Sequence, residues 1–440
     1  MTHLLPFLAG ACLQAMTTRP VGAGRRARTG RFLPIAFLAA CAIAARAEPE
    51  LQVRFGWPNV AARAAAGGEL RVAYLGGSIT AAEGWRTLTT AFLRRQWPGL
   101  SVVEINAGLP GTGSDLGACR VGRDVLRQQP DLVFVEFAVN DAATPPAQIG
   151  RTMEGIVRQV WQANPHTDLC FLYAVSTPGL PDLEADRFPA AARAMEAIAS
   201  HYGIPSVHVG VEVARRLAAG SLVFKDPAAP DDPRTFSADG VHPTAAGHRL
   251  YFDVLARSLP RLLAATGPRP PALPAALHAD NWSGARLRVV DDAMRRGGWV
   301  AVAPGDPNLR GVTKALLPPT WRTAEPGAAL EFEFSGRQFG LLGIAAPDSG
   351  EFRVAIDGQA PVTGTFFDAY ASPTFCRQRT WFHPGELADG PHRVKVELLG
   401  TTIDKLAIKA AAGKPADDPA PYAPHTLTIC GLLTIAIAAP

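Results

Sequence analysis

The sequence predicts an α/β domain with a parallel sheet, followed by an antiparallel β-sandwich. From Glu69 to about Leu259, short apolar runs alternate with longer amphipathic stretches, as strands alternate with helices in α/β proteins. Beyond a proline-rich stretch, the pattern changes to alternating apolar runs separated by Gly and Asp turns, with no long helical period. These two observations decide the fold class.

The apolar runs of the first region have the length of strands, and helical stretches separate them. This order predicts a parallel sheet covered by helices on both faces, a three-layer α/β/α arrangement with right-handed crossovers. The helix over 115–129 should have Ser114 or Asp115 as its cap. The expected strands are Leu70–Leu75, Ser101–Ile105, Leu132–Phe137, Leu169–Ala174 and Ser206–Val209, and the expected helices are Trp85–Trp97, Asp115–Gln129, Ala147–Ala163, Glu184–Tyr202 and Pro243–Leu259.

A proline-rich stretch marks the boundary between the two folds. Thr266–Ala275 contains four prolines, which is typical of a stiff linker. We therefore expect the α/β domain over 48–265, the linker over 266–278 and the β-sandwich over 279–440. The expected sandwich strands are Leu330–Phe334, Phe339–Ile344, Phe352–Ile356, Arg393–Leu398 and Leu427–Ile437.

Residues 1–47 have the pattern of a signal peptide. A stretch with four arginines precedes the apolar run Phe32–Ala45, and Ala45-Arg46-Ala47 fits an A-x-A cleavage site. The run is too short for a transmembrane helix, which needs about 20 apolar residues. Leu38–Cys41 also resembles a lipobox, in which Cys41 would carry a lipid anchor. The expected location is secreted or periplasmic, with anchoring to a bacterial membrane as the alternative.

Composition and charge restrict the class of partner. The chain is 48% hydrophobic and 19% charged, as globular proteins are. Its net charge of +4 includes six arginines and no acid within residues 1–47, so the remainder carries 4 − 6 = −2. A charge near zero argues against nucleic acid as a partner.

Four cysteines remain after residue 47, and their spacing fits no zinc site. Cys170 and Cys430 lie in apolar runs, which predicts buried free thiols. The sequence selects no disulfide pair and indicates no cofactor. A zinc site formed by Asp239, His242 and His248 is the metal alternative, although their spacing matches no metal pair on one helix.

Ser78 is the candidate nucleophile. It follows the strand Leu70–Leu75 after Gly76 and Gly77, and two glycines allow a sharp turn and close backbone approach. A nucleophile of an α/β protein belongs at this carboxyl end of a strand. The helix that follows would present free N–H groups near Ser78. The chain has no G-x-S-x-G nucleophile elbow, so the sequence does not point to the α/β-hydrolase fold.

Asp239 and His242 are the candidate carboxylate and base. They lie three residues apart on one loop, just before the helix that begins near Pro243. A serine nucleophile needs a base within reach of its hydroxyl, and the base needs a carboxylate that fixes its tautomer. Taken alone, a capping aspartate and a surface histidine explain the pair equally well.

Gly111 and Asn140 are the candidate oxyanion donors. Gly111 lies in the glycine-rich segment after the second strand, and Asn140 follows the third strand. A backbone N–H and a side-chain amide both stabilise a developing oxyanion. All four segments follow strand ends and therefore belong to one rim of the sheet, which ordinary turn chemistry does not explain.

Together these residues resemble the SGNH (GDSL-like) hydrolase superfamily over roughly residues 69–259. Ser78, Gly111, Asn140 and the pair Asp239 and His242 match its four blocks in order. Two departures exist: Gly77 replaces the aspartate of the usual G-D-S, and Ala138 replaces the glycine of G-x-N-D. The first should change the hydrogen bonding around the serine and so its rate, whereas neither removes a catalytic group.

The resemblance implies a serine esterase that works by two-step acyl transfer. Ser78 would attack the ester, His242 would act as the base and Asp239 would orient it, while Ser78 N–H, Gly111 N–H and Asn140 would hold the oxyanion. An SGNH domain joined to a β-sandwich is similar to bacterial carbohydrate esterases, which implies an O-acetylated polysaccharide as substrate.

Two other functions remain open at this point. One is a lipid esterase or thioesterase of the same superfamily. The other is a non-catalytic glycan-binding surface protein built on a decayed hydrolase, although the intact triad argues against it. Eight of the aromatic residues of the sandwich region could stack on sugars, but we expect most of them to fill its core. They are Trp282, Trp299, Trp321, Phe366, Phe367, Tyr370, Trp381 and Phe382.

Overall fold

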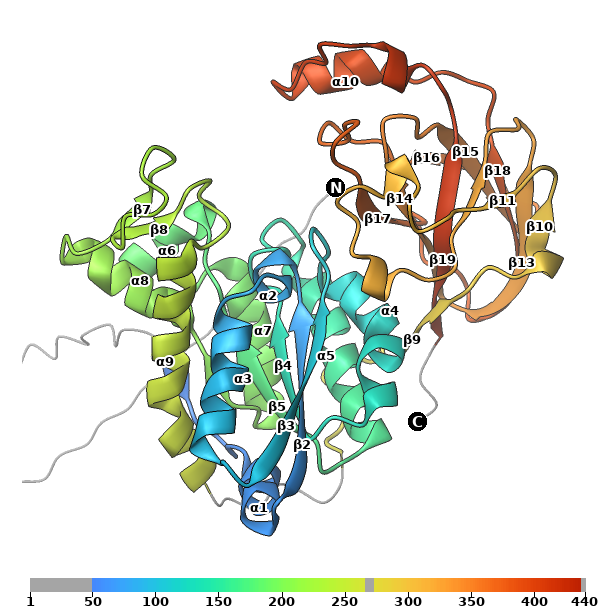
Figure 1. The fold of residues 1–440 in the computed structure, drawn as a ribbon. Coiled ribbons are helices and arrows are strands. Elements are labelled where there is room, and N and C mark those ends of the chain that lie inside the picture. Colours follow the sequence, from blue (N-terminus) through green and yellow to red (C-terminus); the bar gives the residue numbers. More distant parts are fainter. Residues whose placement is uncertain (1–49, 266–272, 437–440) are drawn as a thin grey trace, which may run out of the picture. The chain divides into compact units, whose positions relative to one another are not determined.

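The computed structural model describes residues 50–265 and 273–436 (Figure 1). The predicted signal peptide over 1–47, Cys41 and the first part of the predicted linker lie outside the described residues. Among the described residues, no helix is long and apolar enough to cross a membrane.

The first domain is built on a six-stranded sheet with the order β1-β6-β5-β4-β2-β3. Five strands are parallel, and the short edge strand β1 runs antiparallel to β6. The central strands are apolar on both faces because helices cover both. The strands are β1 (Leu51–Gln52), β2 (Gly68–Gly76), β3 (Leu100–Gly108), β4 (Leu132–Glu136), β5 (Asp168–Leu172) and β6 (Ser206–Val207).

The helices form two layers, one on each face of this sheet (Figure 1). On one face α3 packs against α9, and on the other α4 packs against α5 and α5 against α7. The predicted three-layer α/β/α class is therefore confirmed. The helices are α1 (Pro58–Ala66), α2 (Ser78–Ala81), α3 (Trp85–Gln96), α4 (Ser114–Asp124), α5 (Pro146–Ala163), α6 (Leu180–Glu184), α7 (Ala190–Tyr202), α8 (Val209–Ala218) and α9 (Ala245–Ala264).

Two expected helices of this domain differ from the prediction. The helix expected over 184–202 is interrupted: α6 ends at Glu184 and α7 begins after Pro189, because proline disfavours the α conformation of the residue before it. The expected cap of α4 is also wrong. Gly113 occupies that position without a side-chain cap, and the Ser114 hydroxyl instead lies 2.6 Å from the Thr152 hydroxyl.

The second domain is the predicted antiparallel sandwich. One sheet has the order β10-β13-β18-β15-β16, and the other has the order β11-β12-β19-β14-β17 with β9 paired to β19. Its strands are β9 (Gly284–Arg288), β10 (Arg295–Arg296), β11 (Val300–Ala301), β12 (Trp321–Thr323), β13 (Ala329–Gly336), β14 (Gln338–Ala345), β15 (Glu351–Ile356), β16 (Val362–Thr365), β17 (Arg377–Phe382), β18 (Gly390–Leu398) and β19 (Leu427–Ala436).

The sandwich core forms between these two sheets, with Phe352 and Val396 from one sheet and Leu341 and Ile429 from the other. Of the eight aromatic residues, four belong to this core or pack against it: Trp299, Phe366, Trp321 and Trp381. Trp282 and Phe382 pack instead with the core of the first domain, Phe367 lies in a separate small cluster, and Tyr370 is 56% exposed, so the expectation that most would fill the sandwich core holds for only half of them. The helix α10 (Lys405–Ala411) was not expected. The four cysteines of the described residues are buried and free.

The chain that enters the sandwich is fastened to α5. The buried carboxylate of Glu154 accepts hydrogen bonds from the backbone N–H groups of Leu277 and His278, at 2.6 and 2.7 Å. Gly155 leaves room for the backbone of Trp282, to which the Gln159 side chain donates at 3.1 Å. Buried hydrogen bonds of this kind fix one domain on the other.

Candidate active site

The turn after β2 places Ser78 at the rim of the sheet. Gly76 and Gly77 form this turn, and Ser78 is the first residue of the short helix α2. A Cβ atom on Gly76 would lie 2.7 Å from the carbonyl oxygen of Glu136. A Cβ atom on Gly77 would overlap the side chain of Asn140. A backbone atom thus obstructs a side chain at residue 76, whereas only the Asn140 side chain does so at residue 77. The turn leaves Ser78 half-buried at the carboxyl edge.

Ser78, His242 and Asp239 form one chain of hydrogen bonds. Ser78 Oγ lies 2.9 Å from His242 Nε2, and His242 Nδ1 lies 2.6 Å from Asp239 Oδ2. With the proton on Nδ1 donated to the carboxylate, Nε2 is free to accept the serine proton. The side chains of His242 and Asp239 are about half exposed, at 53% and 54%, so the site is open to solvent.

The loop after β8 (Thr235–Ser237) holds the carboxylate in place. Asp239 Oδ1 accepts hydrogen bonds from the backbone N–H groups of Val241 and His242, each at 2.8 Å, and from the Ser237 hydroxyl at 3.1 Å. Partial burial would raise the pKa of Asp239, but the hydrogen bonds from His242 and Val241 outweigh it and hold that pKa below its ordinary value. The carboxylate is therefore ionised at neutral pH.

Gly111 and Asn140 lie on the loops that flank this turn. Gly111 is exposed and has a φ of 72°, and its loop begins where Leu109 N–H donates to the carbonyl oxygen of Gly76 at 2.9 Å. Asn140 follows β4 and packs against Gly77. Ser78, Gly111 and Asn140 thus follow strands of the six-stranded sheet, as predicted, whereas Asp239 and His242 follow β8, which belongs to a separate two-stranded sheet.

Two buried carboxyl groups behind these loops were not predicted from the sequence. Glu136 Oε2 accepts a hydrogen bond from Thr80 Oγ1 at 2.8 Å, and Asp141 accepts one from Ser114 N–H at 3.1 Å. Burial raises the pKa of each to about 7. Glu136 could have been recognised from the sequence, because it is an acidic residue within the apolar run of β4.

The three residues of the zinc alternative have other partners. Asp239 and His242 bond to each other, and His248 Nδ1 accepts a hydrogen bond from Trp85 N–H at 3.4 Å. Burial lowers the pKa of His248 to about 4, so it is neutral. Within residues 50–265 and 273–436, no group of three or more His, Cys, Asp or Glu side chains is placed to hold a metal ion.

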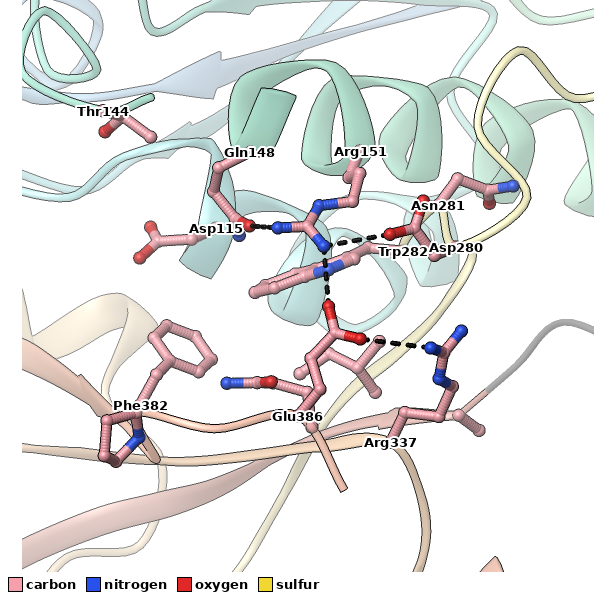
Figure 2. Close-up of a pocket in the computed structure, with 14 residues that line it drawn as sticks. Asp115, Thr144, Gln148, Arg151, Asp280, Asn281, Trp282, Arg337, Phe382 and Glu386 are labelled. Atoms are coloured by element: carbon pink, nitrogen blue, oxygen red, sulfur yellow. Dashed lines mark hydrogen bonds and ion pairs between the residues drawn. The ribbon is translucent and has the colours of Figure 1, made fainter. Parts of the chain in front are cut away.

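A separate cavity of about 480 Å³ lies between the two domains, and none of the five predicted site residues lines it. Figure 2 shows the Arg151 guanidinium at its centre, donating to Gln148, Asp280 and Glu386. Glu386 also pairs with Arg337 at 3.1 Å. Opposite charges compensate one another here, which is typical of an interface that docks two domains.

The fold and the family comparison define a hydrolase that acts on ester bonds. Residues 74–250 match the model of the GDSL-like Lipase/Acylhydrolase family, so this part of the chain is a GDSL-like domain, as the resemblance predicted. No curated protein matches the chain.

Two solved structures are similar to the chain over both of its domains, and others match a smaller part of it. A two-domain esterase (CEX) active on acetylated mannans, co-crystallised with mannopentaose, is 21% identical, with a TM-score of 0.67. A second crystal structure of such an esterase gives a TM-score of 0.69, also at 21% identity. Each match covers 89% of this chain and 100% of the other. An acetylxylan esterase from Geobacillus stearothermophilus is 20% identical over 44% of this chain and 95% of its own, with a TM-score of 0.35.

Proposed function

We propose that the protein is a serine esterase that removes O-acetyl groups from a polysaccharide. The observation that carries this proposal is the hydrogen-bond chain from Ser78 Oγ through His242 to Asp239, with lengths of 2.9 and 2.6 Å. A hydroxyl, an imidazole and a carboxylate in this order constitute the working unit of a serine hydrolase.

In the proposed reaction, Ser78 Oγ attacks the acetyl carbonyl carbon while His242 Nε2 takes the hydroxyl proton. The N–H groups of Ser78 and Gly111 and the amide of Asn140 hold the oxyanion of the tetrahedral intermediate. His242 returns the proton to the leaving sugar oxygen, which leaves an acetyl ester on Ser78. Water then attacks this ester with His242 as the base, which releases acetate and restores the serine.

The substrate assignment rests on two observations. The side chains of His242 and Asp239 are about half exposed, which leaves room for a polymer that cannot enter a deep pocket. The solved structures that cover both domains are esterases active on acetylated mannans. At 21% identity this likeness shows the fold, so the polysaccharide is part of the proposal. A secreted or periplasmic location completes it, because such polymers lie outside the cell.

Acetate release from acetylated mannan and xylan tests the proposal. Ser78→Ala should abolish release without lowering the melting temperature, whereas Ser221→Ala, at an exposed serine, should leave the rate unchanged. Rates near wild type in folded Ser78→Ala would overturn the assignment. A preference for decanoyl over acetyl p-nitrophenyl esters would favour a lipid esterase, and glycan binding without turnover would favour the non-catalytic alternative.

A further inference from the structure

Arg377 of the sandwich lies against the loop that carries Gly111. Its NH1 atom would be 3.3 Å from a Cβ atom built on Gly111. Arg377 is the first residue of β17, an edge strand of its sheet. A residue of the second domain therefore faces the exposed glycine that is the proposed oxyanion donor of the first.

The guanidinium is held in a fixed orientation. Arg377 Nε donates to Asp368 Oδ2 at 2.9 Å, and NH2 donates to the same oxygen. Asp368 Oδ1 in turn accepts from the backbone N–H groups of Tyr370 and Ala371, at 2.9 and 3.2 Å. Among the residues that the structure describes, NH1 of Arg377 has no hydrogen-bond partner. This nitrogen can therefore donate a hydrogen bond to a group beside Gly111.

The surroundings of Arg377 carry an excess of positive charge. Asp368 is shared with Arg379, whose NH1 atom lies 3.7 Å from the same carboxylate oxygen. The single negative charge of Asp368 therefore pairs with the guanidinium groups of both Arg377 and Arg379. Lys414 Nζ adds a further positive charge 4.6 Å from the ring centre of Tyr370, and the Arg377 guanidinium lies 5.1 Å from that centre.

We propose that Arg377 is a positioning residue of the esterase site, supplied by the second domain. It packs against the Gly111 loop and places a fixed positive charge near the point where the tetrahedral intermediate becomes negative. A preorganised charge at such a point stabilises the transition state without reorganisation during the reaction. This inference rests on the proposed function, and it makes turnover of even a small acetyl ester depend on the sandwich.

The test compares Arg377→Gln, Arg377→Lys and a control, Arg393→Gln, with p-nitrophenyl acetate. Arg393 is an exposed arginine of the other sheet that pairs with Glu333. We expect Arg377→Gln to lower kcat about 10-fold with KM nearly unchanged, less than the ~10²–10³ of a direct oxyanion donor. Arg377→Lys should recover part of the loss, and the control should match wild type.

The lysine variant separates a charge effect from a structural one. Lysine restores the positive charge but not the planar guanidinium that bonds to Asp368. Wild-type kcat in folded Arg377→Gln would overturn the inference. A loss in Arg377→Lys equal to that in Arg377→Gln would also overturn it. If the wild-type enzyme showed no Ser78-dependent turnover, the proposed function itself would fail, whatever Arg377 does.

Discussion

Replacing Gly77 with alanine should displace the Asn140 amide and so remove one donor from the proposed oxyanion site. A Cβ atom at residue 77 would overlap Asn140 Oδ1 and lie 2.6 and 3.0 Å from Cγ and Nδ2. Real Cβ atoms essentially never approach other heavy atoms closer than 3.0 Å. Because the obstacle is a side chain, we expect Asn140 to rotate away while the backbone stays in place.

The expected loss of kcat follows from the number of oxyanion donors that each variant removes. Removing one oxyanion donor costs ~10²–10³ in kcat, or about 3–4 kcal/mol. Asn140→Ala removes the donor directly, and Gly77→Ala removes it by displacement. Since both changes abolish the same interaction, the double variant should lose about as much as either single variant, whereas independent effects would multiply to ~10⁴–10⁶.

The assay is kcat for p-nitrophenyl acetate in wild type, both single variants and the double variant. Gly122→Ala in α4 is the matched control, because a Cβ atom there would meet nothing within 4 Å. Melting temperatures verify that each variant folds. Wild-type kcat in Gly77→Ala, or fully multiplicative losses in the double variant, would refute this reasoning. The same overlap predicts that restoring the family's aspartate with Gly77→Asp lowers activity.

Two further predictions concern the support of the site. Ser237→Ala removes the hydroxyl that donates to Asp239 and accepts from Gly240 N–H, so kcat for p-nitrophenyl acetate should fall roughly 10-fold, and an unchanged kcat would exclude this role. Burial raises the pKa of Glu136 from 4.5 to about 7, so the native state binds its proton more tightly than the unfolded chain. As the pH rises from 4.5 to about 7, the unfolded chain loses this proton while the native state keeps it, so the contribution of Glu136 should lower stability by about 3 kcal/mol. Urea unfolding of Glu136→Gln should lack this component, whereas wild-type and variant stabilities that run parallel with pH would contradict it.

The sequence predicted the fold class because its main signals are local. The run Leu132–Phe137 has the length and composition of a strand buried on both faces, and β4 covers Leu132–Glu136. Asp357-Gly358 predicted a tight turn, and both residues have positive φ between β15 and β16. Patterns of this kind depend only on neighbours along the chain.

The departures from prediction have identifiable physical causes. Helical periodicity continued through Pro189, although proline ends the preceding turn. Ser114 was expected to cap α4, but its hydroxyl lies 2.6 Å from that of Thr152 on α5, and its own N–H donates to Asp141. Such tertiary contacts override local propensity and are not visible in a short segment of sequence.

The sequence predicts the residues of the candidate site where they directly follow a recognisable strand. Ser78, Gly111 and Asn140 follow strands of the parallel sheet, so their place at one rim follows from that sheet. Asp239 and His242 follow β8, which pairs with β7 (Val223–Lys225) in a separate two-stranded sheet, so the folding of that segment brings them to Ser78. Glu136 was hidden inside an apolar run. Arg377 belongs to a different domain, and only the docking of that domain brings it to Gly111.

Labelling with a fluorophosphonate probe, followed by peptide mass spectrometry, tests most directly whether Ser78 is the nucleophile. We expect a single covalent adduct on the peptide that contains residue 78, formed rapidly by the wild-type enzyme and very slowly by His242→Ala. An adduct on a different serine, or a folded protein that remains unlabelled at residue 78, would contradict it.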